Sequence, residues 1–234
     1  YKMENLKKYK EEWLSKGLYG SKIAYIDFET TGLIIGEARV VSVAIVHLEL
    51  GKGEPEVVYS QVINPQIPIP KVTSKIHGIY DQDVVDKPTF LQQLPDMMIH
   101  LQNRFLAAYN LPFDWGMLDS ELRRTVGVSH PFIGICGKVL AMAVCNRPQG
   151  KGNHKLVNVC KQFGVPINNH DAESDALAGA KLLQMHMPKL GIKFGEIREY
   201  WAWQREYAIQ KERELRRYFR TKNRKSSNWP WTEL

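Results

Sequence analysis

Four acidic residues of this chain lie in three short motifs, and the third motif also contains a histidine. In chain order, the five residues are Asp27, Glu29, Asp114, His170 and Asp175. Carboxylate oxygens are the ligands that hard divalent cations such as Mg²⁺ prefer, and a histidine beside such a site can accept a proton near neutral pH. The order and spacing of these residues therefore predict a site for two divalent metals that assists hydrolysis of a phosphodiester.

Asp27 and Glu29 follow the apolar residues 23–26, which are typical of a buried strand. Side chains alternate between the two faces of a strand, so both carboxylates should project from the same face. Two anions that lie so close together repel each other unless a cation lies between them. The pair favours a metal site, although an Asp and a Glu at the solvated end of a strand also occur without one.

Asp114 comes after a strand predicted over residues 105–109 and opens a helix predicted over residues 115–125. Taken alone, an aspartate in this place favours a structural role, because a helix N-cap contributes about 1 kcal/mol. A metal-binding role becomes the better interpretation only when Asp114 is considered with the other two motifs.

Asp175 is expected one turn into a helix over residues 171–187, where alanines surround it. Small neighbours would let this helix pack close to a sheet, and a carboxylate on such an apolar face is costly without a cation or hydrogen-bond partners. His170 lies in the loop before the helix, from which it can reach a water beside a metal. We expect Asp171 to cap the helix and Glu173 to face solvent.

The elements around the motifs predict an α/β fold. Strands over residues 22–28, 40–48 and 57–63 should form an antiparallel meander. Strands and helices then alternate, which predicts a mixed central sheet, with three antiparallel strands and then parallel strands, covered by helices. The further elements are a helix over 4–18, short helices over 72–76 and 82–85, a helix that begins after Thr89 and ends near Asn103, a strand over 131–136, and helices over 138–145 and 154–163.

Composition and charge narrow the class of protein. The chain is 44% hydrophobic and carries a net charge of +7, and no apolar run approaches the ~20 residues of a membrane helix. From residue 191 onward, 11 Lys and Arg stand against 6 Asp and Glu, which suggests nucleic acid as a partner. A solvated basic helix without a partner is the alternative. Three cysteines without metal spacing, and a polar start to the chain, favour a cytoplasmic protein with no membrane segment.

The three motifs closely resemble those of the DEDDh 3′–5′ exonuclease family, which includes the proofreading subunits of bacterial DNA polymerases. They stand here as Asp27/Glu29, Asn110/Asp114 and His170/Asp175, in the family's order. Residues 30–32 and the Ile-His-Gly-Ile segment at 76–79 are further similarities, and the resemblance covers about residues 23–186. All five defining positions are filled, so a catalytically inactive relative is not expected.

This resemblance implies a ribonuclease H-like fold and two Mg²⁺ or Mn²⁺ ions ~3.5–4 Å apart. It places Asp27, Glu29 and Asp175 around one ion, with Asp27 bridging to the second and Asp114 near the second. It makes His170 the group that accepts the proton of the attacking water, and it implies release of nucleoside 5′-monophosphates from the 3′ end of a mainly single-stranded nucleic acid, with DNA favoured. Residues implied to contact the substrate are Thr30, Leu33, His77 and Asn110, although Leu33 could equally belong to the core.

The division expected for the chain is an N-terminal helical segment (1–20), an exonuclease domain (21–190) and a basic, Trp-rich helical extension (191–234). The extension could pack on the core, clamp nucleic acid, or dock onto a polymerase or another protein. An RNA-trimming 3′–5′ exoribonuclease and a subunit that binds nucleic acid or a polymerase without catalysis are the alternative functions. A phosphatase or kinase is poorly supported, because no phosphate-binding glycine loop is present.

Overall fold

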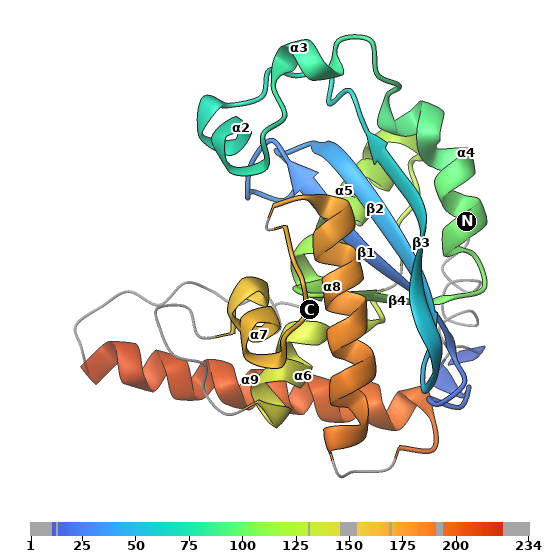
Figure 1. The fold of residues 1–234 in the computed structure, drawn as a ribbon, viewed down its shortest axis with the longest axis vertical. Helices are drawn as coiled ribbons and strands as arrows, with labels where there is room; N and C mark the ends of the chain where they lie inside the picture. The colour runs from blue at the N-terminus through green and yellow to red at the C-terminus, as the bar shows by residue number, and fades with distance from the viewer. Residues whose placement is uncertain are drawn as a thin grey trace.

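The computed structural model describes residues 11–12, 14–130, 132–145, 154–168, 170–190 and 194–221. Within them a mixed five-stranded sheet has the strand order β3-β2-β1-β4-β5 (Figure 1). The first three strands pair antiparallel, and β4 and β5 continue the sheet in parallel. The strands are β1 (Lys22–Thr30), β2 (Val40–Glu49), β3 (Lys52–Val62), β4 (Phe105–Ala108) and β5 (Ile135–Cys136). The predicted meander followed by parallel strands is confirmed.

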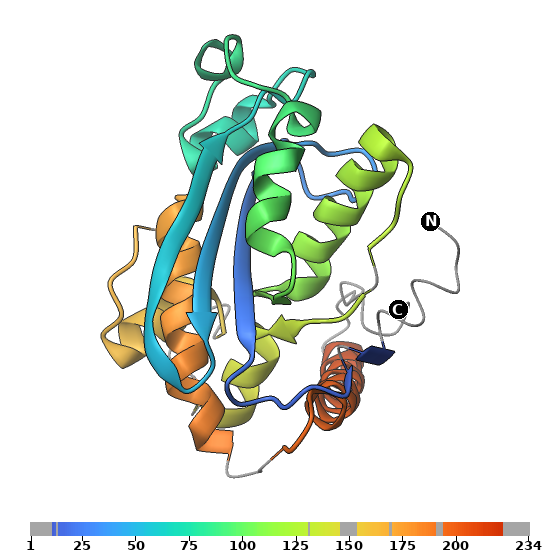
Figure 2. The same ribbon diagram turned by 90° about the vertical axis from the view of Figure 1, so that its right-hand side faces the viewer.

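Helices cover both faces of this sheet. Figure 2 shows α4 and α5 against one face and α8 across the other. The helices are α2 (Lys71–His77), α3 (Asp81–Val84), α4 (Phe90–Leu101), α5 (Leu111–Val126), α6 (Gly137–Val144), α7 (Leu156–Phe163), α8 (Ala172–His186), the 3₁₀ helix η1 (Met187–Leu190) and α9 (Ile197–Thr221). None of the helices in the described ranges is both long and apolar enough to cross a membrane.

Several predicted bounds are wrong. The last strand has two residues rather than six, because only Ile135 and Cys136 pair with β4. β3 begins five residues earlier than expected, at Lys52, and α5 begins at Leu111 rather than at Trp115. For the helix predicted over 4–18, residues 11, 12 and 14 are helical, and its first seven residues lie outside the described residues.

The approach of α8 to the sheet depends on a glycine that faces a tyrosine. Tyr25 of β1 is fully buried beneath α8. A Cβ atom on Gly179 would lie 2.6 Å from Cζ of Tyr25, and one on Gly137 would lie 3.0 Å from its hydroxyl oxygen. Real Cβ atoms essentially never show the first of these distances. The ring of Tyr25 therefore fits only because two glycines leave room for it, and this close packing brings α8 against β1.

The long helix α9 packs on the domain through a buried glutamine. The side-chain oxygen of Gln204 accepts a hydrogen bond of 2.7 Å from the backbone amide of Cys136, and its amide donates one of 3.0 Å to the carbonyl of Gly134. Near its start, the Ile197 amide donates to the carbonyl of Lys16 at 2.9 Å. These contacts support the first of the three roles expected for the extension, namely a helix packed on the core beside the N-terminal segment.

Candidate active site

Two carboxylates line the face of β1 that α8 covers. Along this strand Ala24, Ile26 and Phe28 belong to the core on the α4 and α5 side. Tyr25 belongs to the core on the α8 side, so Asp27 and Glu29, which follow it at intervals of two, continue along that same face. The placement predicted from strand alternation is the one that the structure has.

The N-terminal end of α8 brings Asp175 and His170 to this face. Asp171 caps the helix and accepts a hydrogen bond of 3.1 Å from the backbone amide of Glu173, which is itself exposed. Both expectations for these residues are confirmed. One turn later the carboxylate of Asp175 is 8% exposed, which agrees with its predicted position among small residues.

A backbone hydrogen bond joins His170 to Asp175. The His170 amide donates to Oδ2 of Asp175 over 3.2 Å, and the residue has a φ of 66°, in the left-handed region that few residues other than glycine occupy. This turn directs the chain so that one ligand atom from each of Glu29, His170 and Asp175 lies within 4.8 Å of the others. Within the described residues, this is the group of side chains whose ligand atoms lie close enough together to hold one metal ion, and Asp27 and Asp114 are not part of it.

Asp114 lies inside α5 rather than at its cap. The helix begins at Leu111, and Asn110 occupies the N-cap position without a side-chain cap hydrogen bond. Pro112 is compatible with this early start, because a proline in the first turn removes only an amide that would be unpaired anyway. The interpretation of Asp114 as an N-cap is therefore wrong. Its side chain is only 4% exposed, and its carboxylate accepts a hydrogen bond from the backbone of Phe28 in β1.

Burial raises the pKa of all four carboxyl groups, and nearby negative charges raise it further. Burial raises the pKa of Asp27 well above its ordinary value, and the charges of Asp114, Asp175 and Glu29 raise it further. Burial and then the charge of Asp175 raise the pKa of Glu29 to about 7. Burial raises the pKa of Asp114 to about 8 and that of Asp175 to about 6, although backbone hydrogen bonds to both groups act in the opposite direction.

These four carboxyl groups fit a divalent cation. In the described part of the chain, no lysine or arginine forms a salt bridge with any of them. Oδ1 of Asp175 is also buried without a hydrogen-bond partner among these residues. Buried anions without a compensating charge are unfavourable, and a metal with oxygen ligands supplies that charge. The cluster is therefore an acidic site, with one histidine, that can hold a divalent metal.

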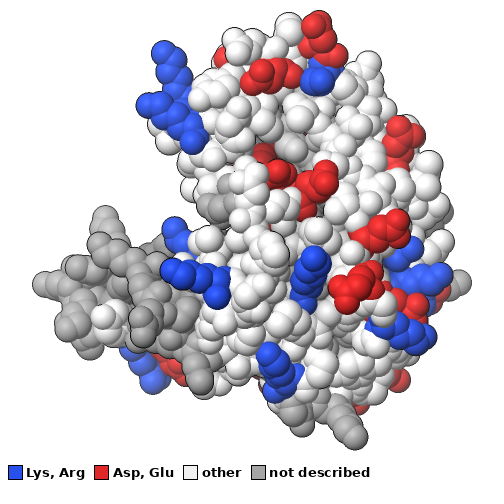
Figure 3. Space-filling view, viewed as in Figure 1, with Lys and Arg blue, Asp and Glu red and all other residues white. Residues whose placement is uncertain are grey.

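A groove of about 630 Å³ extends from this site between β3 and the segment that follows α2. Glu29, His170, His77, Lys75 and Lys87 are among the residues that line it. In Figure 3 acidic side chains gather near the middle of one face, below the lobe that carries α2 and α3, and that lobe carries both basic and acidic side chains. The groove thus combines two lysines with carboxylates of the acidic site.

The four residues implied to contact substrate are placed differently from one another. His77 lines the groove, and burial followed by the nearby charge of His170 lowers its pKa. Thr30 is buried, and its hydroxyl donates to the carbonyl of Gly32 over 2.7 Å. Leu33 is 81% exposed, so the alternative that it belongs to the core is wrong. Asn110 is half-buried, and its Oδ1 has no partner within the described residues.

Several residues that line the groove were not assigned to the site from the sequence. Lys75, Lys87 and Asn168 line the groove, and so does Asp171, whose charge also raises the pKa of Glu29. Lys75 could have been found, because it directly precedes the Ile-His-Gly-Ile segment. Lys87 could not, because it is distant from every motif along the chain and only the crossing through α2 and α3 brings it near.

Comparison with known proteins agrees with this geometry. The family model described as RNase_T, Exonuclease, matches residues 24–183. The epsilon subunit of DNA polymerase III from Treponema pallidum is 33% identical over 154 residues, which are 64% of this chain and 69% of that protein. The PolC-type DNA polymerase III from Thermotoga petrophila is 27% identical over 179 residues, but these cover 74% of this chain and only 12% of that much longer protein.

Solved structures agree on the fold. A structure described as Exonuclease X in complex with 5′ overhanging duplex DNA is 25% identical and superposes with a TM-score of 0.54, covering 75% of this chain and 99% of that one. An Exonuclease I structure, 19% identical with a TM-score of 0.56, covers 73% of this chain and 43% of that chain, and it shows the fold alone. With its ribonuclease H-like sheet and its acidic site, the chain belongs to the RNase T exonuclease family and is a hydrolytic exonuclease of the DEDDh type.

Proposed function

We propose that this exonuclease removes nucleotides from the 3′ end of DNA, mainly of single strands, and releases nucleoside 5′-monophosphates with the help of two divalent metals. The observation that carries the proposal is the cluster of Asp27, Glu29, Asp114 and Asp175, in which burial and repulsion raise every pKa and no basic side chain of the described residues compensates. The direction of hydrolysis follows from the resemblance of the motifs to the DEDDh family.

Asp27, Glu29 and Asp175 would hold one ion, and Asp27 and Asp114 would face the other. When bound, Mg²⁺ or Mn²⁺ would neutralise the developing charge on the phosphate and assist ionisation of the attacking water. The carboxylates provide the fixed oxygen ligands that both ions prefer. Their raised pKa values also mean that metal and protons compete for the same oxygens, so metal should bind more tightly as the pH rises.

His170 would act as the general base. Its side chain is exposed, so a proton taken from the attacking water can pass on to solvent. The oxygen of that water forms a bond to phosphorus, the bond from phosphorus to the 3′ oxygen breaks, and the leaving oxygen takes a proton from solvent. His170 has a φ of 66°, and its backbone amide donates a hydrogen bond to Asp175. Both features fix the start of the His170 side chain beside the acidic cluster.

The groove supports a nucleic acid as the substrate. Lys75 and Lys87 line it together with Glu29 and His170, and the two lysines would attract phosphates. The solved structure of Exonuclease X contains DNA, and the Treponema pallidum relative is a DNA polymerase subunit, so DNA is the proposed substrate and a polymerase the proposed partner. The proposal includes the division of the chain into an N-terminal segment (1–20), an exonuclease domain (21–190) and a C-terminal extension (191–234).

A 5′-labelled oligonucleotide tests the function directly. The purified chain is incubated with matched single-stranded and double-stranded DNA and RNA, each with Mg²⁺, with Mn²⁺ or with a chelator. We expect stepwise shortening from the 3′ end of single-stranded DNA, only with metal present, and mononucleotide products. If RNA were shortened faster than DNA, the proposed function would instead be RNA trimming. An oligonucleotide that is retarded on a gel but intact in every metal condition would contradict a catalytic function.

A further inference from the structure

A loop beside the acidic site exposes apolar side chains. Residues 31–39 connect β1, which carries Asp27 and Glu29, to β2. Leu33 and Ile34 in this loop are 81% and 62% exposed. Large apolar side chains exposed side by side are unfavourable in water, and such a patch often marks a contact with a ligand. The position of this loop relative to the acidic site therefore bears on how a substrate is bound.

The two ends of the loop are joined by hydrogen bonds. The Thr31 amide donates to the carbonyl of Arg39 over 2.9 Å, and the Arg39 amide donates to the hydroxyl of Thr31 over 3.0 Å. Nearer the tip, the Ala38 amide donates to the carbonyl of Ile34 over 2.9 Å. These bonds give the loop a defined shape but leave its position over the rest of the domain undetermined.

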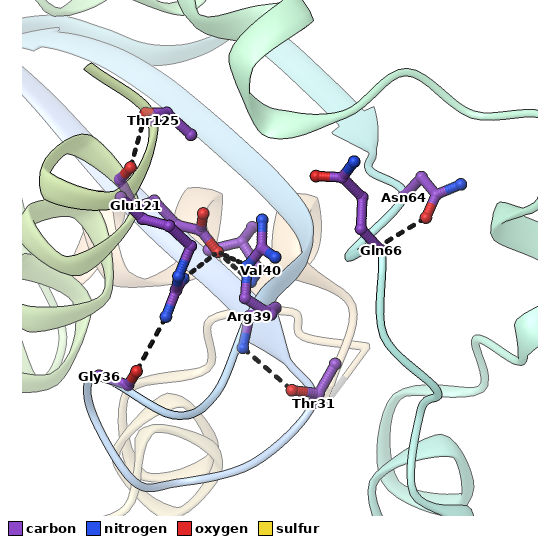
Figure 4. A network of polar contacts seen from close by, with 9 residues as sticks. Thr31, Gly36, Arg39, Val40, Asn64, Gln66, Glu121 and Thr125 are labelled. Atoms are coloured by element: carbon purple, nitrogen blue, oxygen red, sulfur yellow. Dashed lines mark hydrogen bonds and ion pairs between the residues drawn. The ribbon is translucent and has the colours of Figure 1, made fainter. Parts of the chain in front are cut away.

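A buried glutamate of α5 fixes that position (Figure 4). Glu121 is fully buried, and its Oε1 accepts a hydrogen bond of 2.8 Å from Nε of Arg39 and one of 3.2 Å from the backbone amide of Val40. Nη1 of Arg124 lies 3.3 Å from the same oxygen. One carboxylate of α5 thereby holds the end of the loop and the first residue of β2.

Arg124 connects this carboxylate to the tip of the loop. Its Nη2 donates to the carbonyl of Gly36 over 2.9 Å, and Gly36 has a φ of +92°, which favours glycine. Next to Gly36, Ile35 packs directly on α5, where a Cβ atom on Gly116 would lie 2.5 Å from Cδ1 of Ile35. The loop therefore contacts α5 at two places, one polar and one apolar.

The same helix carries Asp114 of the acidic site. Asp114 and Glu121 are seven residues apart, which is close to two turns of an α-helix, so both side chains leave the same side of α5. A rigid helix thus connects the loop to one carboxylate of the site. Movement of the loop away from α5 would change the distance between its apolar tip and the carboxylates.

We propose that Arg124 and Glu121 are positioning residues that hold loop 31–39 in place, so that Leu33 and Ile34 offer a preformed apolar surface to the terminal base of the substrate. This inference rests on the proposed function and adds to it the part of the chain that orders the substrate end. A preformed loop avoids the entropy cost of ordering it on binding. Loss of the contacts between these two residues and the loop should therefore weaken substrate binding and leave the chemical step nearly unchanged.

Two adjacent arginines provide the test and its control. Arg124 donates a hydrogen bond to the loop. Arg123 instead donates hydrogen bonds to Asp119 of α5 and to Ser129, which follows the helix. Arg124→Ala and Arg123→Ala each remove one partly exposed guanidinium from the same helix. KM and kcat are measured with single-stranded DNA, and hydrogen exchange is followed at the backbone amides of residues 34–39. Circular dichroism checks that both variants fold.

For Arg124→Ala we expect KM to rise about tenfold, with kcat changed by no more than about twofold. The loop amides should exchange about tenfold faster, and Arg124→Lys, which keeps the charge but not the two-pronged geometry, should recover part of both effects. Arg123→Ala should match the unmodified chain. Equal KM or equal loop exchange in the two alanine variants would overturn the proposal, as would a loss confined to kcat. If the unmodified chain did not degrade DNA at all, the proposed function would fail, and exchange would still decide whether Arg124 anchors the loop.

Discussion

Helix α5 carries two buried carboxylates in opposite surroundings. Glu121 is fully buried, and two arginines, Arg39 and Arg124, lie within 3.3 Å of its Oε1. Asp114 is almost as buried, two turns earlier, but its neighbours are the further carboxyl groups of Glu29 and Asp27. The chain itself thus supplies positive charge to one of these groups, and it places the other among further acidic groups.

The difference separates a structural carboxylate from one prepared for a ligand. A buried ion pair that the chain provides gives a fixed contact, because either partner alone would be costly. Acidic groups that the chain leaves without counter-charge are unfavourable until a cation arrives. The free energy lost by placing Asp114 near Asp27 and Glu29 is therefore available to favour metal binding.

Removal of an acidic ligand should give the largest effect on activity. Asp27→Ala should reduce DNA hydrolysis about a thousandfold or more, because Asp27 is the carboxylate expected to face both ions. The variant should remain folded, since it loses a repelled anion. Activity is measured with the labelled oligonucleotide, and Asp96→Ala, at an exposed residue of α4, is the control. Full activity in Asp27→Ala would refute the site.

Replacement of His170 should act on the rate and on its dependence on pH. His170→Ala should slow turnover about a hundredfold, as expected when a general base is lost, and the rise of the rate through neutral pH should weaken. His170 also lies within 4.8 Å of the ligand atoms of Glu29 and Asp175, so metal binding is measured separately by thermal stabilisation. An unchanged pH profile would exclude His170 as the base, and lost metal binding would make it a ligand instead.

Substitution of Glu121 should lower the stability of the protein, whereas substitution in the acidic site should lower its activity. Glu121→Gln removes the charge that Arg39 faces and should lower the free energy of unfolding by about 3 kcal/mol, because a buried arginine is left without its partner. Asp114→Asn removes repulsion and should leave the stability of the metal-free protein unchanged or raised. Urea unfolding without metal compares the two. The contrast would be lost if both variants were destabilised equally.

The smallest expected effect is a change of stability with pH. The folded-state pKa is raised to about 6 for Asp175, about 7 for Glu29 and about 8 for Asp114. Stability from a raised pKa is complete below the unfolded value and is lost as the pH rises through the folded value. The melting temperature without metal should therefore fall between pH 5 and pH 8.

Added metal should reverse this trend. Because metal needs ionised carboxylates, Mn²⁺ should raise the melting temperature more at pH 8 than at pH 5, and the gain should shrink in Asp27→Ala. A melting temperature that rises steadily toward pH 8 without metal would show that these carboxyl groups are not under repulsion.

The acidic site was largely predictable, because its geometry is local. Asp27 and Glu29 share a face through the alternation of one strand, and Asp175 follows His170 and Asp171 within two helical turns. The antiparallel meander of β1, β2 and β3 followed from short turns and apolar runs for the same reason. Proximity of the three motifs to one another came from resemblance to a family and not from any local rule.

The anchor of loop 31–39 was not predictable from the pattern. Glu121 lies in a stretch with Asp119, Arg123 and Arg124, which is typical of a solvated helix face with pairs one turn apart. Its main partner, Arg39, is 82 positions away, and no period in the sequence connects them. The early start of α5 was also missed, although proline is acceptable in the first turn of a helix.

The packing of Tyr25 against Gly179 has a consequence for the metal ligands. Gly179 follows Asp175 by one turn on α8, and the absence of a side chain there sets how near the helix comes to β1. Even a methyl group would act as a spacer, lifting the helix and carrying Asp175 away from the strand that bears Asp27. Gly179, which has no side chain and takes no part in catalysis, thus helps to set the distance between the ligand Asp175 and the ligands on β1.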